Sequence, residues 1–327
     1  MCFSHDNLAI FNIMKLVVEY EVVRHNKIKD INVFINSIRM RSLHMHHDME
    51  LLLLVKGEGS ILIKNRKYRI FEGDCILINA YESHEILSRE GSMTFIIIQF
   101  SNHFLRDYFY TIRNAVFPDP LVREHFPEKE YKELTDDILA LGKIYLEEKE
   151  LYELQLVAVF SKILHSLFTY MNVEELSESE YSKRKKVNRR IDRISAYIDA
   201  NYTEQIRLAD IAESEGITLT HLSHFIRDNF GMSFQDYLKE KRLGAAVRLI
   251  TDPSITLSAV ASESGFSELK YMTAAFKDVF DLTPQQYRQM GLDLSAENKK
   301  ASAFEYIYSK DEALHLLSEI ETSIILR

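Results

Sequence analysis

Three histidines and a glutamate in the first third of the chain have side chains that could do metal chemistry. They occur in the pattern His44-x-His46-x3-Glu50-x6-Gly57, then Gly73-x5-Asn79, then His84. Imidazole nitrogens and carboxylate oxygens are ligands that suit Fe, Mn, Ni or Zn. Such a set could bind a divalent metal if folding brought the side chains together.

The pattern resembles the two sequence motifs of the cupins, which are small antiparallel β-barrels. In metal-binding cupins, the two histidines and the glutamate of the first motif act together with the histidine of the second. The resemblance therefore implies His44, His46, Glu50 and His84 as a metal or ligand site. The alternative is that these residues are structural at the mouth of the barrel. The expectation is thus no obligatory cofactor, with a divalent metal left open.

The second motif departs from the cupin pattern at three positions. Asn79 and Tyr81 stand where Pro and Gly are usual, and Ser88 stands where the motif ends in Asn. These departures favour the structural alternative over metal binding.

A stretch near the C-terminus occurs twice. Leu208, Ala212 and Gly216 recur 49 residues later as Leu257, Ala261 and Gly265, and Leu222, Phe230 and Tyr237 recur 50 residues later as Met272, Phe280 and Tyr287. Self-similarity at a fixed spacing indicates one supersecondary unit used twice.

Each copy has the pattern of two short helices joined by a glycine turn. Apolar residues at i, i+3 and i+4 give the first helix of each copy one buried stripe. Gly216 and Gly265 then stand where the turn can require a positive φ. The second helices have inward apolar residues, which are Leu222, Phe225, Ile226 and Phe230 in one copy and Met272, Ala275, Phe276 and Phe280 in the other. This is the helix-turn-helix pattern, whose second helix reads the DNA major groove.

The region from about residue 191 to 288 resembles the AraC/XylS family of transcription regulators. The residues that carry the resemblance include Asp210-Ile211-Ala212, Phe230-Gly231, Tyr237-Leu238, Arg242-Leu243, Gly265-Phe266, Phe276-Lys277, Thr283-Pro284 and Tyr287-Arg288. The resemblance implies double-stranded promoter DNA as the partner, a homodimer, and contact with RNA polymerase as in an activator. It also implies a cupin-like sensor barrel, which would respond to a small-molecule effector or, as the alternative, to a protein partner. Whether the protein activates or represses stays open.

The resemblance also implies which residues contact DNA. Base-facing positions of the first reading helix fall at Thr220, Ser223 and His224, with Arg227 nearby, and the 50-residue offset gives Lys270, Thr273, Ala274 and Lys277 in the second. The family commonly has Arg at the positions of His224 and Ala274. Since Ala offers only apolar contact, the first copy should supply most of the specificity. The alternative is that Lys270 reads guanine and restores the balance.

The elements between these motifs indicate a barrel followed by helices. Short β-type runs separated by turn signals favour a small antiparallel barrel or sandwich, and they are Val33–Arg39, Met49–Val55, Ser60–Ile63, Tyr68–Phe71, Cys75–Ile78 and Thr94–Phe100. Helical spacing follows over residues 134–146 and 151–171. The second helix is apolar on two faces, so one face should pack on the barrel. The other should pair with a second subunit or lie in the same core.

The remaining segments connect or extend these parts. Residues 8–25 form an apolar N-terminal arm of open role, and residues 173–187 are polar without apolar periodicity, as in an interdomain linker. Residues 234–250 predict one continuous helix between the two copies. Residues 291–327 include a predicted amphipathic helix that should dock on its own chain, with a partner contact as the alternative.

Charge and composition agree with a DNA-binding part on an acidic body. The net charge is −9. Residues 183–290 contain 16 Lys and Arg against 14 Asp and Glu, or +2, which leaves −11 for the rest. Residues 183–193 are strongly basic, as in a phosphate-contacting segment or a solvated linker face. Two cysteines and no apolar run near 18 residues predict a cytoplasmic protein with no membrane contact.

The expected architecture is α+β with two domains. Residues 1–172 form the arm, a cupin-like antiparallel β-barrel and a helical dimerisation element, 173–187 a linker, 188–290 an all-α double helix-turn-helix domain, and 291–327 a helical extension. The expected function is a sequence-specific transcription regulator and not an enzyme. The competing class is a cupin metalloenzyme, an oxygenase or isomerase with structural C-terminal helices, but this would leave the duplicated reading helices unexplained.

Overall fold

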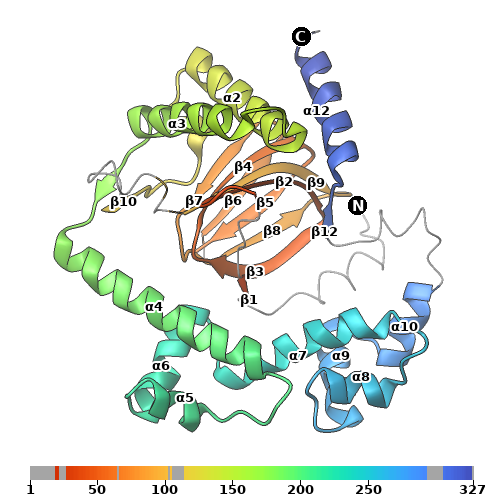
Figure 1. Ribbon diagram of the computed structural model, residues 1–327. Helices are drawn as coiled ribbons and strands as arrows, with labels where there is room; N and C mark the ends of the chain where they lie inside the picture. The colour runs from red at the N-terminus through yellow and green to blue at the C-terminus, as the bar shows by residue number, and fades with distance from the viewer. Residues whose placement is uncertain are drawn as a thin grey trace. The chain divides into compact units, whose positions relative to one another are not determined.

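The computed structural model describes residues 19–21, 27–64, 66–101, 104, 114–292 and 305–325. The chain divides into two compact units, one made mainly of residues 186–302 and the other of most of the remaining chain. The first contains the helices α5 to α10 and the second the strands of a barrel (Figure 1). The predicted α+β architecture is therefore confirmed. Among the described helices, none combines the length and apolar character needed to cross a membrane.

Two five-stranded antiparallel sheets form the barrel unit. Their strand orders are β1-β3-β8-β5-β6 and β12-β2-β9-β4-β7. The bounds are β1 Glu19–Glu21, β2 Ile31–Ile38, β3 Met40–His46, β4 Met49–Lys56, β5 Glu58–Ile63, β6 Arg66–Phe71, β7 Cys75–Ile78, β8 His84–Ser88, β9 Met93–Phe100 and β12 Glu305–Ile307. The predicted arm, residues 8–25, lies outside the described residues apart from β1.

Both faces of the central strands are apolar because each faces a different core. Along β4, Leu52 and Leu54 belong to a core cluster between the sheets, while Leu51 and Leu53 belong to a cluster shared with helices α2 (Glu128–Glu147) and α3 (Tyr152–Tyr170). The alternation follows from the period of two in a strand. The predicted helices 134–146 and 151–171 therefore exist and pack on the barrel. The short segments η2 (Val122–His125), β10 (Ala115–Val116) and β11 (Glu174–Glu175) complete this unit.

Every strand run predicted from the sequence is present, but β3 and β8 were not predicted. These two strands carry His44, His46 and His84, and their polar residues break the alternation by which strands were recognised. The barrel interior buries them, so tertiary context decides the conformation there.

The segment predicted as a linker is largely helical. Helix α4 (Glu178–Asn201) begins within it, and the two units divide between Lys185 and Lys186, inside this helix. The helix starts with a capping box, in which the Glu180 amide donates to the Ser177 hydroxyl and the Ser177 amide donates to the Glu180 carboxylate. A solvated helix needs no apolar stripe over its first turns, which is why the pattern did not reveal it.

The unit made mainly of residues 186–302 contains two helix pairs joined by a long helix. The bounds are α5 Leu208–Ser214, α6 Leu219–Phe230, α7 Phe234–Ile250, α8 Leu257–Glu263, α9 Leu269–Phe280 and α10 Pro284–Leu292. The predicted continuous helix over residues 234–250 is confirmed as α7. Gly216 and Gly265 have φ values of 64° and 85°, as the turn pattern required.

The C-terminal extension returns to the barrel unit. Helix α12 (Lys310–Ile325) buries Ala313 and Leu317 in the cluster formed with α2 and α3, and β12 joins the sheet beside β2. The prediction that it docks on its own chain is confirmed.

Candidate nucleic-acid interface and barrel site

The first reading helix, α6, presents one polar face to solvent. Its buried residues are Leu222, Phe225, Ile226 and Phe230, and the Thr218 side chain caps its first turn by accepting from the His221 amide. The positions predicted to contact DNA lie on the opposite side of the helix, and all of them are exposed. They are Thr220, Ser223, His224 and Arg227. The helix therefore has the form that a major-groove reading helix requires.

The second reading helix, α9, differs from α6 in its polar face. Lys270, Ala274 and Lys277 are exposed, but Thr273 is half-buried and its hydroxyl donates to the Leu269 carbonyl at 2.9 Å. The Lys270 ammonium lies 2.9 Å from a Glu268 carboxylate oxygen. This hydrogen bond to Glu268 raises the pKa of Lys270.

The ends of α9 also lack the capping side chains of α6. Glu268 at the start of α9 makes no side-chain cap, whereas Thr218 caps α6. At the other end, Asp281 adopts a left-handed φ of 53° where the first copy has Gly231 at 72°.

Both copies share the same supporting contacts. The Phe230 and Tyr237 rings meet edge to face at 5.0 Å, and Phe280 and Tyr287 meet at 4.8 Å. Arg242 donates to the carbonyls of Tyr202 and Glu204 before α5, and Arg288 donates to those of Ile250 and Ile255 before α8. Each arginine thus fixes the loop that enters a helix pair.

Two arginines of the basic segment in α4 form an intramolecular ion pair. Arg190 and Arg193 both donate to Glu215, at 3.1 Å and 2.6 Å, in the turn after α5. The hydrogen bond from Arg193, opposed by burial and reinforced by Arg190, lowers the pKa of Glu215. Lys186 and Arg189 are exposed on α4 and leave their charge toward solvent.

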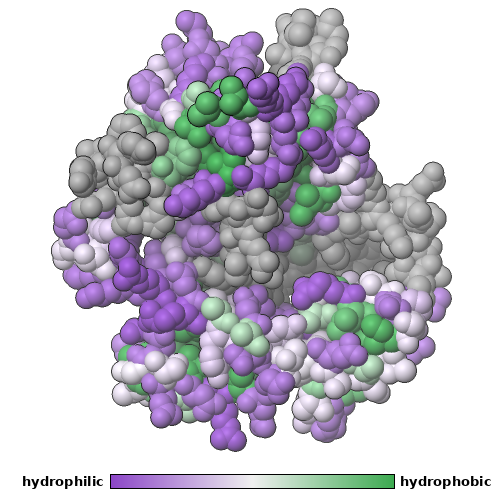
Figure 2. Space-filling model, viewed as in Figure 1, coloured by the Kyte–Doolittle hydropathy of each residue, from purple (hydrophilic) through white to green (hydrophobic). Residues whose placement is uncertain are grey.

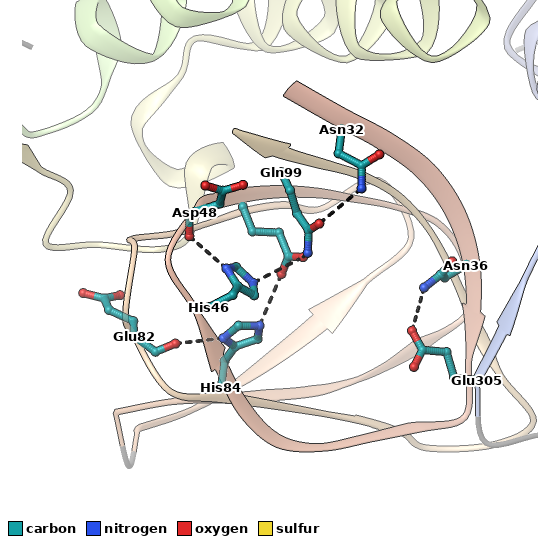
Figure 3. Close-up of polar contacts among 9 residues, drawn as sticks. Asn32, Asn36, His46, Asp48, Glu82, His84, Gln99 and Glu305 are labelled. Carbon is teal, nitrogen blue, oxygen red and sulfur yellow. Dashed lines mark hydrogen bonds and ion pairs between the residues drawn. The ribbon is translucent and has the colours of Figure 1, made fainter. Parts of the chain in front are cut away.

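In the barrel, the structure brings the predicted histidines together. His44 and His46 lie on β3 and His84 on β8, all buried, with one ring nitrogen of each within 4.8 Å of the others. Glu50 on β4 faces two of them: its carboxylate oxygens lie 3.6 Å from Nε2 of His46 and 3.2 Å from Nε2 of His84 (Figure 3).

Backbone carbonyls set the tautomers of two histidines. Nδ1 of His46 lies 2.9 Å from the Asp48 carbonyl, and Nδ1 of His84 lies 2.9 Å from the Glu82 carbonyl. A carbonyl can only accept, so Nδ1 carries hydrogen in both rings and Nε2 faces Glu50. Burial opposes ionisation of Glu50, but the charges and hydrogen bonds of His46 and His84 outweigh it and hold the pKa of Glu50 well below its usual value.

The polar cluster continues along the sheet beyond the predicted residues. Gln99 on β9 donates to Glu50 at 3.1 Å, and Asn32 on β2 donates to Gln99 at 3.5 Å (Figure 3). These three side chains are register neighbours on β4, β9 and β2. The sequence alone does not reveal Gln99, because only strand pairing shows that it lies opposite Glu50.

The departures from the cupin pattern have structural roles. The Asn79 side chain donates to the Phe117 carbonyl at 2.7 Å and accepts from the Phe117 amide at 2.9 Å, as a paired backbone strand would. Tyr81 adopts a φ of 61°, which the usual Gly would take without strain.

One exposed aromatic residue on α9 was also missed. Tyr271 is 51% exposed, and the Lys270 ammonium lies 4.9 Å from its ring centroid. A large exposed ring between predicted contact residues is a candidate for contact with sugar or base. Tyr271 does not belong to the inward-facing apolar stripe of α9, and this departure from the pattern could have identified it from the sequence.

Two family models match the chain. An AraC-like ligand binding domain matches residues 38–164, and a helix-turn-helix domain matches residues 211–290. The uncharacterized HTH-type transcriptional regulator YdeC of Bacillus subtilis strain 168 is 22% identical over 254 residues, which are 76% of this chain and 86% of YdeC.

The chain is also similar to a longer relative and to two solved structures. An uncharacterized HTH-type transcriptional regulator of Staphylococcus aureus strain MRSA252 is 24% identical over 81% of this chain, which spans only 34% of that relative. The solved C-terminal domain of the response regulator yesN from Fusobacterium nucleatum is 33% identical, with 30% of this chain and 95% of that one covered at a TM-score of 0.29. ToxT from Vibrio cholerae O395 is 18% identical, with 81% and 100% covered at a TM-score of 0.45. The chain belongs to the AraC family, as a ligand-sensing, DNA-binding transcription regulator.

Proposed function

We propose that the protein binds promoter DNA by placing α6 and α9 in two successive major-groove segments about 34 Å apart. The observation that carries this proposal is that both helices bury an apolar face and expose the other, while α7 joins them as one helix of 17 residues. Such a helix is about 25 Å long. It therefore supports a fixed spacing between the two reading helices.

The two copies contribute unequally in this proposal. Thr220, Ser223 and His224 read base edges, and Arg227 contacts phosphate or base. In α9, Ala274 offers only apolar contact, and Lys270 and Lys277 mainly anchor the helix to the phosphates of the DNA.

A base-by-base substitution scan of a duplex selected from a random-sequence pool tests the assignment. His224→Ala should relax preference at defined base pairs by ~1 to 3 kcal/mol. Lys270→Ala should weaken binding to all sequences alike and lower the salt slope by about one. Lys129→Ala, at an exposed position of α2, is the charge-matched control. The reverse result contradicts the assignment, and a footprint with a single protected segment contradicts the two-groove arrangement.

The departures in the second motif favour a structural role, but the three histidines meet in the structure, and we further propose that their cluster binds a divalent metal. Nε2 of His46 and Nε2 of His84 both face the Glu50 carboxylate. That arrangement needs a proton on each Nε2 or a cation among these atoms. His44 adds a third buried nitrogen, so the donor set fits Fe, Mn, Ni or Zn. His44, His46 and His84, with Glu50 beside them, would hold the metal, which would supply Lewis-acid chemistry there.

Elemental analysis of the purified full chain tests this proposal. His46→Ala should abolish metal retention, whereas His47→Ala should retain it, because that neighbouring ring is 34% exposed and lies outside the cluster. Wild-type protein that folds and regulates without metal would contradict the proposal and leave the cluster a structural one.

The proposed function also involves a second subunit and RNA polymerase. We propose that the protein is a homodimer that pairs through the exposed apolar face of α3. Its place of action is the cytoplasm, where promoter DNA and RNA polymerase are available. Figure 2 shows apolar side chains gathered over α3 among hydrophilic ones. Leu154 on α3 is 68% exposed, and Leu151 immediately before the helix is 63% exposed. An apolar patch of this kind is typical of a protein-protein interface.

A further inference from the structure

The C-terminal segment, residues 305–325, has no role in the function described so far. Both matched family regions end before it, at residues 164 and 290. It nevertheless belongs to the barrel unit, while α10, the last described helix before it, belongs to the DNA-binding unit. The chain thus leaves the barrel unit through α4 and returns to it through this segment.

The first part of the segment adds a strand to the barrel. Strand β12 pairs antiparallel with β2, and the Tyr308 amide donates to the Ile35 carbonyl at 2.9 Å. An added strand gains its affinity from backbone hydrogen bonds along a sheet edge. The edge of β2 is therefore a docking surface, and the chain's own C-terminal segment occupies it.

Glu305 fixes the position of the added strand. Its two carboxylate oxygens accept from Asn36 Nδ2 and from Arg41 Nη1, both at 2.6 Å (Figure 3 shows the first). Asn36 lies on β2 and is 1% exposed, whereas Arg41 lies on β3. One carboxylate thus joins strands from both sheets, and β3 is the strand that carries His44 and His46.

Helix α12 forms the second part of the contact. Glu312 accepts from the amide and the hydroxyl of Ser309 and caps its start. Ala313 and Leu317 are 1% exposed. Leu317 Cδ1 lies 3.8 Å from where a Cβ on Gly142 of α2 would be, so the two helices approach closely. The contact buries Ala313 and Leu317 fully, packs the partly buried Leu314, Leu316 and Ile320 against the same core, and adds one short strand.

We propose that residues 305–325 are an intramolecular ligand of the barrel and that their docking is thermodynamically linked to DNA binding. A docked segment adds an attachment of the DNA-binding unit to the barrel besides α4, and release of the segment removes that attachment. The orientations available to the reading helices differ between the two states, so DNA favours one of them. The linkage rests on the proposed DNA binding, and it must be reciprocal.

Hydrogen exchange of the full chain tests the docking. Amides of residues 305–325 and of β2 should exchange at least about tenfold faster in Leu317→Asp, which places a charge in the buried contact. Ser318→Asp carries the same charge on the exposed side of α12 and should match wild type. Where Leu317→Asp does not fold, Glu305→Arg replaces it, and Glu305→Arg with Arg41→Glu should restore protection. Unchanged exchange in the released variants overturns the docking.

Binding to a duplex selected from a random-sequence pool tests the linkage. The affinity of Leu317→Asp should differ from wild type by about fivefold or more, and that of Ser318→Asp by less than about twofold. Saturating DNA should also change the exchange of residues 305–325 in wild-type protein. Equal affinities despite a released segment overturn the linkage. A wild-type chain that binds no DNA overturns the proposed function as well, while the exchange data still decide the docking.

Discussion

At the scale of single residues, Glu240 is a buried carboxyl group whose ionisation opposes folding. It lies on α7 and is 6% exposed. Burial raises its pKa to about 7, with Lys239 acting in the opposite direction and Asp278 and Asp236 adding to the rise. A carboxyl group with a raised pKa binds more protons in the folded state than in the unfolded state between these two pKa values.

The free energy of unfolding should therefore fall as the pH rises from about 4.5 to about 7. Glu240→Gln should lack this part of the pH dependence and be more stable than wild type at pH 8 by on the order of 2 kcal/mol. Urea unfolding across this pH range measures it. Glu263→Gln, at an exposed position of α8, is the matched control. If Glu240→Gln shows the same pH dependence of the free energy of unfolding as wild type, Glu240 is not the group that causes it.

Much of the barrel site could be predicted at this scale, because the spacing of His44, His46 and His84 placed them in known motif positions. The structure confirms that these three meet. It was not possible to predict that Gln99 lies opposite Glu50, because their pairing depends on the register between β4 and β9. Register is a tertiary property that one strand's sequence does not contain.

At the scale of elements, the two turn glycines occupy equivalent positions in different surroundings. A Cβ on Gly265 would lie 2.6 Å from the Tyr202 carbonyl oxygen and 2.7 Å from Thr203 Cα, whereas a Cβ on Gly216 would have no atom within 4 Å. Both residues have positive φ, so both substitutions are strained. Only the substitution at Gly265 also requires neighbouring backbone atoms to move away from the new Cβ.

Gly216→Ala should therefore cost about 1 kcal/mol of stability, and Gly265→Ala more than about 3 kcal/mol. Thermal unfolding followed by circular dichroism at 222 nm measures both, and the two variants are controls for each other. Equal losses would mean that the loop before α5 yields to the added methyl group.

Periodicity predicted the helices well where one face is buried, as in α7. It failed where burial did not set the pattern. The first turns of α4 are solvated and polar, and β3 and β8 place polar residues inside the barrel. In both cases capping or tertiary contacts decide the conformation, and neither leaves an apolar repeat.

At the scale of the whole molecule, the exposed face of α3 predicts self-association. Leu154→Asp should raise the dissociation constant of the dimer by at least about tenfold, because the charge would have to be buried on association. Sedimentation equilibrium measures this, with Ser318→Asp as a control for added charge. A wild-type chain that stays monomeric, or a dimer unaffected by Leu154→Asp, contradicts the assignment of α3.

The uneven caps of the two reading helices have a consequence for how the DNA-binding unit opens. Without a capping side chain at Glu268, and with Asp281 held in a left-handed conformation, α9 lacks about 1 kcal/mol at each end that α6 has. Its ends should fray more often, so at any moment a smaller fraction of molecules has a complete second reading helix. That fraction lowers the apparent affinity of the second half-site in proportion. Warming should therefore narrow recognition from two grooves to one before the protein unfolds.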